Sequence, residues 1–173
     1  MIDDEIITKL KELDGEVNFG SLLAFMIENK IPYKNRTIKG FGMGLSTADG
    51  VILDLEKISK YHPKLLFYVI LHETGHYKRI AKMGRNKLIQ FLSEEDFEVF
   101  FEHVVNEEII ADRYSCLLYR IFNGENFPRV ATQQLEDPTR REKYRGPART
   151  LYGTVKNTEE SYNELIKSFI DED

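Results

Sequence analysis

Apolar residues recur at intervals of three and four positions in several segments of the chain, and this spacing predicts amphipathic helices. The first predicted helix covers 3–13, and the second follows Asn18, whose side chain is suited to cap a helix. A strongly apolar helix is predicted over about 63–83, because a proline opens it and a glycine follows it. The longest predicted helix, about 94–122, follows Ser93, a residue of the kind that opens a capping box.

One segment has the pattern of β-strands instead. Residues 37–55 contain four glycines, an Asp-Gly turn signal and a closing Val-Ile-Leu-Asp-Leu run, which predicts two short strands joined by a turn. Segment 123–153 combines prolines, glycines and many charges, so we expect it to be irregular, and a last amphipathic helix is predicted at about 158–170. These elements predict an α+β fold, predominantly helical, with a small β-hairpin or sheet beside helix 63–83.

Composition and charge narrow the class of protein. The 173 residues are 42% apolar and 31% charged, which suits one globular domain spanning 1–173. The longest apolar run, 65–71, is far shorter than the roughly 20 residues of a membrane-spanning helix, and the acidic N-terminus lacks the basic start of a secretory signal. The single cysteine, Cys116, excludes an intramolecular disulfide and is expected to be a small buried apolar residue. We therefore expect a cytoplasmic protein, and the net charge of −5 argues against nucleic acid as a partner.

The predicted helix 63–83 contains His72-Glu73-Thr74-Gly75-His76, the HExxH pattern. Residues four apart lie on one face of a helix, so both imidazoles can bind one ion. Glu73 projects at a neighbouring angle, from which its carboxylate can reach a water molecule at the metal. At this composition the pattern arises by chance in roughly one chain in a hundred, so it favours a metal site over a pair of surface histidines.

A second candidate group lies 32 residues after His76, in the run Glu108-Ile109-Ile110-Ala111-Asp112. Catalytic zinc needs a third protein ligand and an open position. Glu108 falls within the apolar, core-facing stripe of helix 94–122, where an unpaired carboxylate would be costly, and a bound cation explains that position. Asp112, one turn further on and facing the same way, is suited to accept the outward ring N–H of a metal-bound histidine.

The two motifs together, HExxH and then Glu-x-x-Ala-Asp, resemble those of the gluzincins, the zinc metallopeptidases whose third ligand is glutamate. With a strand that begins at Gly50 and the run Glu-x-x-Ala-Asp-x-Tyr, the segment 38–119 looks like the ImmA/IrrE-type metallopeptidase family. The resemblance implies a small zincin-like fold, an intracellular setting and cleavage of regulatory proteins such as repressors. The longer insertion at 83–96 and the C-terminal region depart from the pattern of that family.

The resemblance implies that one zinc ion (Zn²⁺) is bound by His72, His76 and Glu108. It also implies that Glu73 is the catalytic residue and that Asp112 interacts with a ligand histidine without contacting the metal. Zinc lowers the pKa of its bound water, and Glu73 accepts the proton of that water and later returns it to the leaving amine. The predicted function is therefore a zinc metallopeptidase acting on an intracellular protein or peptide. Two histidines and one glutamate also suit manganese or iron.

Two other functions stay open on the sequence alone. The same metal-bearing scaffold can serve as a non-catalytic regulatory module, such as one half of a toxin–antidote or repressor–antirepressor pair. It can also hydrolyse a non-peptide amide or crosslinked DNA–protein adducts. An activity that depends on Glu73 distinguishes an enzyme from the regulatory module, and retention on DNA with a steep salt dependence would indicate action on DNA adducts.

Residues outside the two motifs are candidates for other parts of the site. Strand 50–55 is expected to pair with an extended substrate at its edge, and the glycine-rich run 40–44 is expected to be a flexible loop or strand kink near the cleft. The basic cluster at 140–149 is expected to be a solvated loop. Three residues are candidates to stabilise the oxyanion of the reaction: Tyr144, Arg145 and Tyr152. Three polar residues near the motifs are expected to be exposed: His62, His103 and Glu107.

Overall fold

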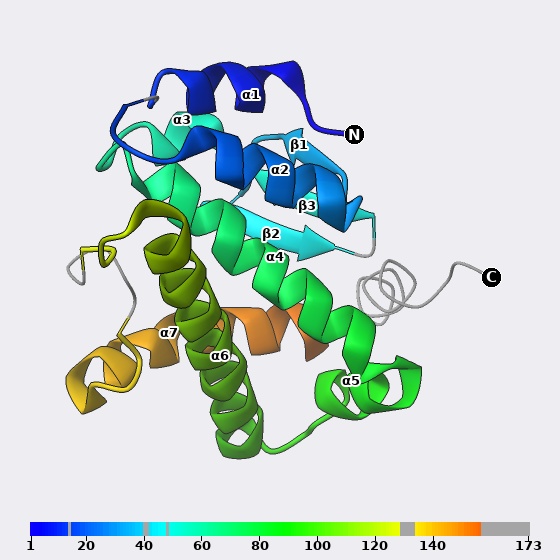
Figure 1. Ribbon diagram of the computed structural model, residues 1–173. Coiled ribbons are helices and arrows are strands. Elements are labelled where there is room, and N and C mark those ends of the chain that lie inside the picture. Colours follow the sequence, from blue (N-terminus) through cyan, green and yellow to red (C-terminus); the bar gives the residue numbers. More distant parts are fainter. Residues whose placement is uncertain (14, 40–41, 48, 129–133, 157–173) are drawn as a thin grey trace.

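The computed structural model describes residues 1–13, 15–39, 42–47, 49–128 and 134–156. Within these ranges the protein is predominantly helical with a small sheet, which confirms the predicted α+β class (Figure 1), and none of the helices has the length and apolar character needed to cross a membrane. The predicted helix 158–170 lies outside the described residues. The helices are α1 (Asp4–Lys11), α2 (Phe19–Asn29), α3 (Leu55–Ile58), α4 (Leu65–Met83), α5 (Arg85–Leu92), α6 (Phe97–Asn123) and α7 (Pro138–Lys156). The strands are β1 (Tyr33–Asn35), β2 (Gly44–Thr47) and β3 (Gly50–Leu53).

The sheet holds three strands in the described residues, in the order β1-β3-β2. The predicted hairpin is present: β2 runs antiparallel to β3 and pairs Leu45 with Ile52. β1 adds a parallel strand that is too short to be recognised from its own pattern. Gly50 begins β3 with φ of +131°, and a Cβ there would lie 2.3 Å from the Pro32 carbonyl oxygen, so glycine is needed where β1 and β3 approach.

β3 is the central strand of the sheet, and this corrects the expectation that strand 50–55 offers its edge to a substrate. One edge of β3 pairs with β1 and the other with β2. In the described residues β2 pairs with β3 alone, so β2 is an edge strand. The prediction was wrong because the hairpin pattern indicates only that β2 and β3 pair with each other. It gives no information on β1, an earlier strand that pairs with the other edge of β3.

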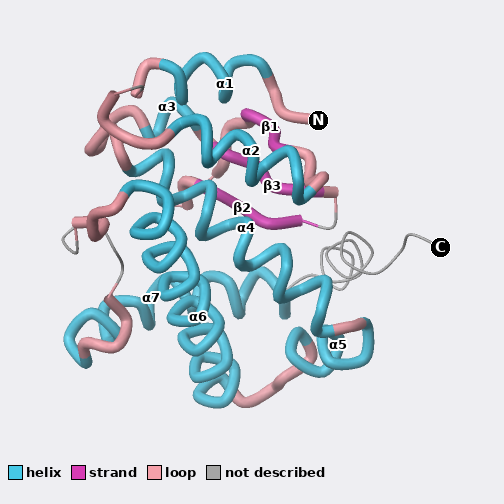
Figure 2. Tube along the Cα trace, in the orientation of Figure 1, coloured by secondary structure: helices cyan, strands magenta, loops and turns pink. Residues whose placement is uncertain are grey.

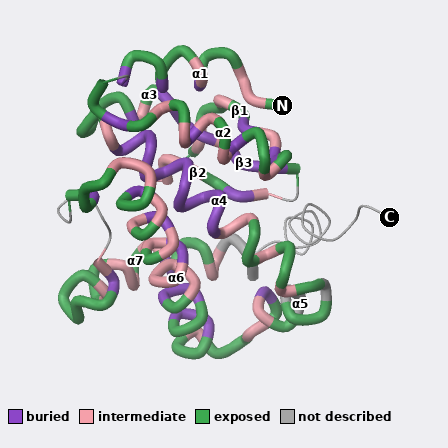
Figure 3. The backbone as a smooth tube through the Cα atoms, in the orientation of Figure 1, coloured by how far each residue is buried: buried purple, intermediate pink, exposed green. Residues whose placement is uncertain are grey.

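α4 lies between the sheet and α6 and contacts both (Figures 1 and 2). Residues 65–75 of α4 are buried throughout (Figure 3), which explains why the first two turns, 65–71, are apolar on all sides apart from the Tyr68 hydroxyl. α6 begins three residues later than predicted, because the side chain of Asp96 accepts hydrogen bonds from the backbone N–H groups of Glu98 and Val99. It ends at Gly124, which has the left-handed conformation typical of a helix end.

Most of the second half of segment 123–153 forms α7, and this corrects the prediction of an irregular segment. Proline suits the first position of a helix, where its missing N–H is no loss. The carboxylate of Asp137 caps this end by accepting hydrogen bonds from the N–H groups of Thr139 and Arg140. The insertion at 83–96 likewise contains a helix, α5, which packs against α4 and α6.

The basic cluster at 140–149 is not a solvated loop, because several of its arginines lie on aromatic rings of α6. The guanidinium carbon of Arg145 is 4.4 Å from the centre of the Phe101 ring, and that of Arg149 is 4.0 Å from the centre of the Phe97 ring. α7 therefore packs on α6 through arginine stems and charges as well as through apolar residues. A pattern of apolar spacing does not detect a helix that is stabilised in this way.

Candidate metal centre

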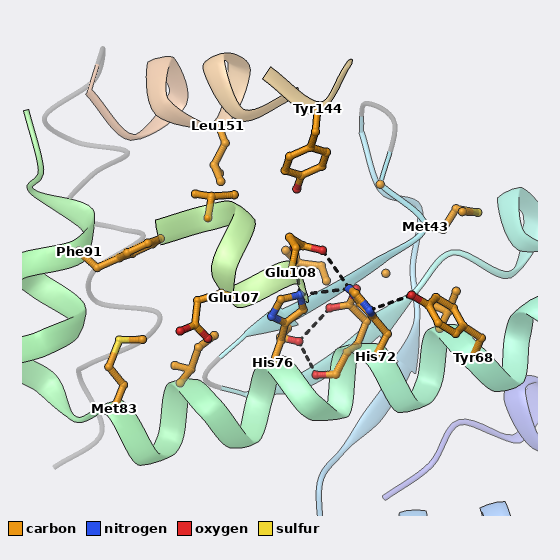
Figure 4. Close-up of a pocket in the computed structure, with 18 of the residues that line it drawn as sticks. Met43, Tyr68, His72, His76, Met83, Phe91, Glu107, Glu108, Tyr144 and Leu151 are labelled. Carbon is orange, nitrogen blue, oxygen red and sulfur yellow. Dashed lines mark hydrogen bonds and ion pairs between the residues drawn. The ribbon is translucent and has the colours of Figure 1, made fainter. Parts of the chain in front are cut away.

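Three side chains from α4 and α6 converge in the interior of the protein (Figure 4). His72 and His76 lie one turn apart on α4, and their Nε2 atoms are 3.2 Å apart. Glu108 reaches them from α6, with Oε2 at 3.1 Å from His72 Nε2 and Oε1 at 3.0 Å from His76 Nε2. The exposed fractions of the side chains are 7% for His72 and 16% for each of the others. These are the three ligands that the sequence predicted, and the structure brings them together.

The chemistry and spacing of this group fit a divalent metal ion. Zinc–nitrogen bonds of about 2.0–2.1 Å place neighbouring ligand atoms of a tetrahedral site about 3.3 Å apart. The contacts among the two Nε2 atoms and the carboxylate oxygens, at 3.0, 3.1 and 3.2 Å, are close to that spacing. Two imidazoles and one carboxylate form a donor set that zinc and other first-row metals accept. The group could therefore hold a metal ion.

The electrostatics of the group favour positive charge beside Glu108. Burial alone lowers the pKa of His76, but the charge of Glu108 and its hydrogen bond outweigh burial and raise this pKa to about 9. Burial alone raises the pKa of Glu108, but the two histidines hold it well below its usual range. The carboxylate is thus ionised at neutral pH, and either a proton on the imidazoles or a metal ion balances its charge.

The close approach of α4 and α6 depends on Gly75. A Cβ at this position would lie 2.8 Å from Cδ1 of Tyr114 on α6, closer than carbon atoms normally pack. Because Gly75 directly precedes His76, its missing side chain lets α6 bring Glu108 to the two imidazoles. The sequence motif contains this glycine, and the packing of the two helices gives the reason for it.

Asp112 contacts His72 through a third residue, Tyr68. The Tyr68 hydroxyl donates a hydrogen bond to Asp112 Oδ1. It also lies 3.3 Å from His72 Nδ1, a contact that Figure 4 shows. Since the proton of Tyr68 is used by Asp112, its oxygen accepts the Nδ1–H of His72, and the Nε2 lone pair is left for a metal ion. This corrects the prediction that Asp112 accepts the histidine N–H directly.

Tyr68 and Ser46 belong to the site and were not predicted from the sequence. Burial, and then the charge of Asp112, raise the pKa of Tyr68 far above its usual value, so the hydroxyl keeps its proton. Its ring stacks on Phe127 with 4.8 Å between the ring centres, which fixes its orientation. The spacing in the sequence could have indicated Tyr68. Tyr68, His72 and His76 are four residues apart and therefore share one face of α4.

The hairpin fixes the orientation of Glu73. The Ser46 hydroxyl on β2 lies 2.9 Å from Glu73 Oε2 and 2.7 Å from the Glu73 carbonyl oxygen, and these two acceptors share its single proton. A Cβ on Gly44 would lie 2.6 Å from Glu73 Cγ, so β2 can approach the carboxylate only because this residue is glycine. Gly42 and Gly44 line the cleft, as the expectation for run 40–44 required, while residues 40 and 41 lie outside the described residues.

His72, His76, Glu108 and Glu73 all line a cavity of about 400 Å³. Of the three oxyanion candidates, Tyr144 lines it, and Figure 4 shows its side chain extending from α7 toward Glu108 and His72. Burial, and then the charges of Glu108 and Glu73, raise the pKa of Tyr144 above its usual value. The hydroxyl therefore keeps its proton and can donate a hydrogen bond into the cavity.

The other two oxyanion candidates are not among the residues that line this cavity, and both have partners elsewhere. Arg145 forms ion pairs with Glu98 at 2.6 Å and with Glu142 at 3.1 Å. Tyr152 donates a hydrogen bond to the backbone carbonyl of Glu95. Both residues therefore hold α7 against the start of α6 and are withdrawn as candidates for the reaction.

Of the residues expected to be exposed, His62 and His103 are exposed and Glu107 is not. Only 18% of the Glu107 side chain is exposed, and Arg79 forms an ion pair with it at 2.8 Å. The prediction was wrong because a residue turned away from the main stripe of α6 still faces the C-terminal half of α4. Cys116 is half-buried and packs against the core, less deeply than expected.

Comparisons with known proteins gave no match. No protein-family model, curated protein or solved structure matched this chain. The resemblance to ImmA/IrrE-type metallopeptidases therefore stays a prediction, and the function is inferred from the residues of the site.

Proposed function

We propose that this protein is a zinc-dependent metallopeptidase with a small zincin-like fold, similar to the ImmA/IrrE type, that cuts an intracellular regulatory protein or peptide. The observation that carries the proposal is the convergence of His72, His76 and Glu108, at 3.0–3.2 Å, on the wall of a cavity that Glu73 also lines. His72, His76 and Glu108 would hold the zinc ion, which would supply an acidified water molecule and a Lewis acid for the peptide carbonyl.

Glu73 supplies the base of the proposed reaction. Its carboxylate lines the same cavity as the ligand atoms and is a neighbour of His72 in the chain. The hydrogen bond from Ser46 holds Oε2, which leaves Oε1 for the attacking water. Glu73 accepts the proton of that water during attack and returns it to the leaving amine.

Tyr144 supplies a hydrogen-bond donor for the oxygen of the scissile carbonyl. This residue reaches the cavity from α7, on the side opposite to the helix that carries the histidines (Figure 4). Its proton is retained at neutral pH, because burial and two nearby carboxylates raise its pKa. A donor placed near developing negative charge lowers the free energy of the transition state.

β2 supplies an edge for an extended substrate. The N–H of Asp54 donates to the Met43 carbonyl, and in an antiparallel pair such bonded positions alternate. Leu45 therefore directs its backbone groups toward β3, while Gly44 and Ser46 direct theirs to the open edge. An extended peptide that pairs with this edge would lie along the cavity, with a peptide bond beside the ligand group.

The test of the proposal is the variant Glu73→Gln. We expect it to bind zinc like the wild type, because the three ligands are unchanged, and to cut peptides about 10²–10⁴-fold more slowly, because the base is lost. The measurements are zinc content by elemental analysis and cleavage of denatured casein and of a randomised peptide library, followed by mass spectrometry.

Glu28→Gln, an exposed glutamate on α2, is the matched control and should keep both zinc and activity. A zinc-loaded wild type that cuts neither casein nor the library would contradict the peptidase and favour the non-catalytic regulatory module. Cleavage by Glu73→Gln at the wild-type rate would show that the base is another residue.

A further inference from the structure

The cavity extends past the metal ligands into an apolar chamber formed by four helices. Figure 4 shows Met83, Phe91 and Leu151 on the side of His76 that faces away from Tyr68. The side chains that we call the apolar chamber come from α4, α5, α6 and α7: Ile80, Met83, Phe91, Leu92, Val104 and Leu151.

The chamber lies within one side chain's reach of the metal ligands. Ile80 follows His76 by four residues on α4, and Val104 precedes Glu108 by four residues on α6. Residues four apart on a helix are neighbours on one face, about 5–6 Å apart at their Cβ atoms. A group held at the ligand atoms would therefore have the chamber directly beside it.

Apart from Glu73 and Glu108, Glu107 is the acidic side chain that lines the cavity in the described part of the chain, and its charge is already paired. Glu107 lines the cavity, and the guanidinium of Arg79 binds both of its carboxylate oxygens, at 2.8 and 3.1 Å. This two-point contact satisfies the charge of Glu107. A basic side chain entering the chamber would find no free carboxylate there, and an acidic one would lose its hydration without gaining a partner.

We infer that the apolar chamber binds one large apolar side chain of the substrate, such as Leu, Phe or Met, at a residue that flanks the cut bond. This inference rests on the proposed peptidase function and names its substrate class: peptides with a bulky apolar residue at the cleavage site. A ligand that places a branched side chain in such a chamber should have an affinity or kcat/KM about 10–100-fold higher than one that places a methyl group there.

Two hydroxamic acids with the same metal-binding group test the chamber without cleavage. We expect the zinc-loaded protein to bind 4-methylpentanohydroxamic acid about 10–100-fold more tightly than acetohydroxamic acid, as measured by calorimetry. Leu151→Glu should remove most of this difference, because it places a carboxylate in the chamber. Leu117→Glu on α6 is the matched control, since Leu117 is 59% exposed and Leu151 43%, and it should leave the difference unchanged.

Cleavage of a randomised peptide library gives the second readout. We expect Leu, Phe and Met to be enriched at one of the two residues that flank the cut bonds, and Leu151→Glu to reduce that enrichment at least tenfold. Equal binding of the two hydroxamic acids, or cleavage with no preference for large apolar residues, would overturn the chamber and leave the peptidase intact. Discrimination between the hydroxamic acids with no cleavage of any peptide would contradict the peptidase and leave the chamber intact.

Discussion

At the scale of single residues, the centre is a set of polar side chains that fix one another. The carboxylate of Glu108 lies 3.0 and 3.1 Å from the Nε2 atoms of the two imidazoles. The Tyr68 hydroxyl, which is bonded to Asp112, contacts Nδ1 of His72. The Ser46 hydroxyl contacts the Glu73 carboxylate. Each of these groups is buried or partly buried, so each needs a partner to offset the loss of water. These contacts fix the orientations of the side chains that we propose as metal ligands and base.

Replacing Tyr68 tests whether it orients His72. Tyr68→Phe keeps the ring on Phe127 but removes the hydroxyl, so we expect zinc affinity to fall about 10–100-fold. Asp112→Asn should have a similar effect, and the double variant should lose little more, because both residues act through one contact. Competition with a chromogenic chelator measures the affinity. Tyr61→Phe, at an exposed tyrosine, is the control, and equal affinities for Tyr68→Phe and wild type would exclude the orienting role.

Asp54 gives a prediction of pH dependence outside the site. Its carboxylate accepts hydrogen bonds from the backbone N–H groups of Ile38 and Lys57, and these bonds hold its pKa below the usual value. The stability it contributes is therefore full above the unfolded pKa of about 3.9 and is lost as the pH falls through the lower folded value. Asp54→Ala should unfold at lower urea than the wild type at pH 6, and the gap should shrink at pH 3. A gap of equal size at both pH values would contradict this account.

At the scale of elements, the sequence predicted those helices whose apolar faces meet the main core. α4 and α6 were predicted with His72, His76 and Glu108 on the faces that meet, because spacing determines which side chains share a face. α7 was missed, since its prolines suggest loop and its contact with α6 uses arginines on Phe97 and Phe101. β1 was missed because three residues carry too little pattern. Tyr68 was missed as part of the site because its role depends on the distance between two helices.

The crossing of α4 and α6 can be tested at Gly75. Gly75→Ala places a methyl group 2.8 Å from the Tyr114 ring, whereas Gly20→Ala on α2 adds one in ordinary contact, 3.7 Å from Asn18 Oδ1. Both changes favour the helix by up to about 1 kcal/mol, so their difference isolates the steric cost. We expect the free energy of unfolding of Gly75→Ala to be lower than that of Gly20→Ala by about 1–3 kcal/mol. Urea denaturation measures both, and equal stabilities would mean that the helices can separate freely at this point.

At the scale of the whole molecule, one centre joins segments that are distant in the chain. Glu108 lies 32 positions after His76 in the chain, and residues of the hairpin and of α7 line the cavity beside them. A metal ion bound by both helices would link them only in the folded state, since the unfolded chain does not hold the three ligands together.

Zinc should therefore stabilise the whole fold. At a free zinc concentration one hundred times the Kd, we expect the free energy of unfolding to rise by about 2.7 kcal/mol. Thermal denaturation with zinc and with a chelator measures this change. Glu108→Ala should lose the response and His103→Ala, at an exposed histidine, should keep it. A response that is lost in His103→Ala and kept in Glu108→Ala would move the third ligand to His103.

The contact between Ser46 and Glu73 connects the proposed substrate-binding strand with the proposed catalytic base. Ser46 belongs to β2, the strand whose open edge we propose as the binding site of the peptide. A peptide bound there would also restrict the motion of the Glu73 carboxylate, the proposed base. Long substrates would then have both a higher kcat and a higher affinity. A dipeptide too short to span β2 would differ from them chiefly by a lower kcat.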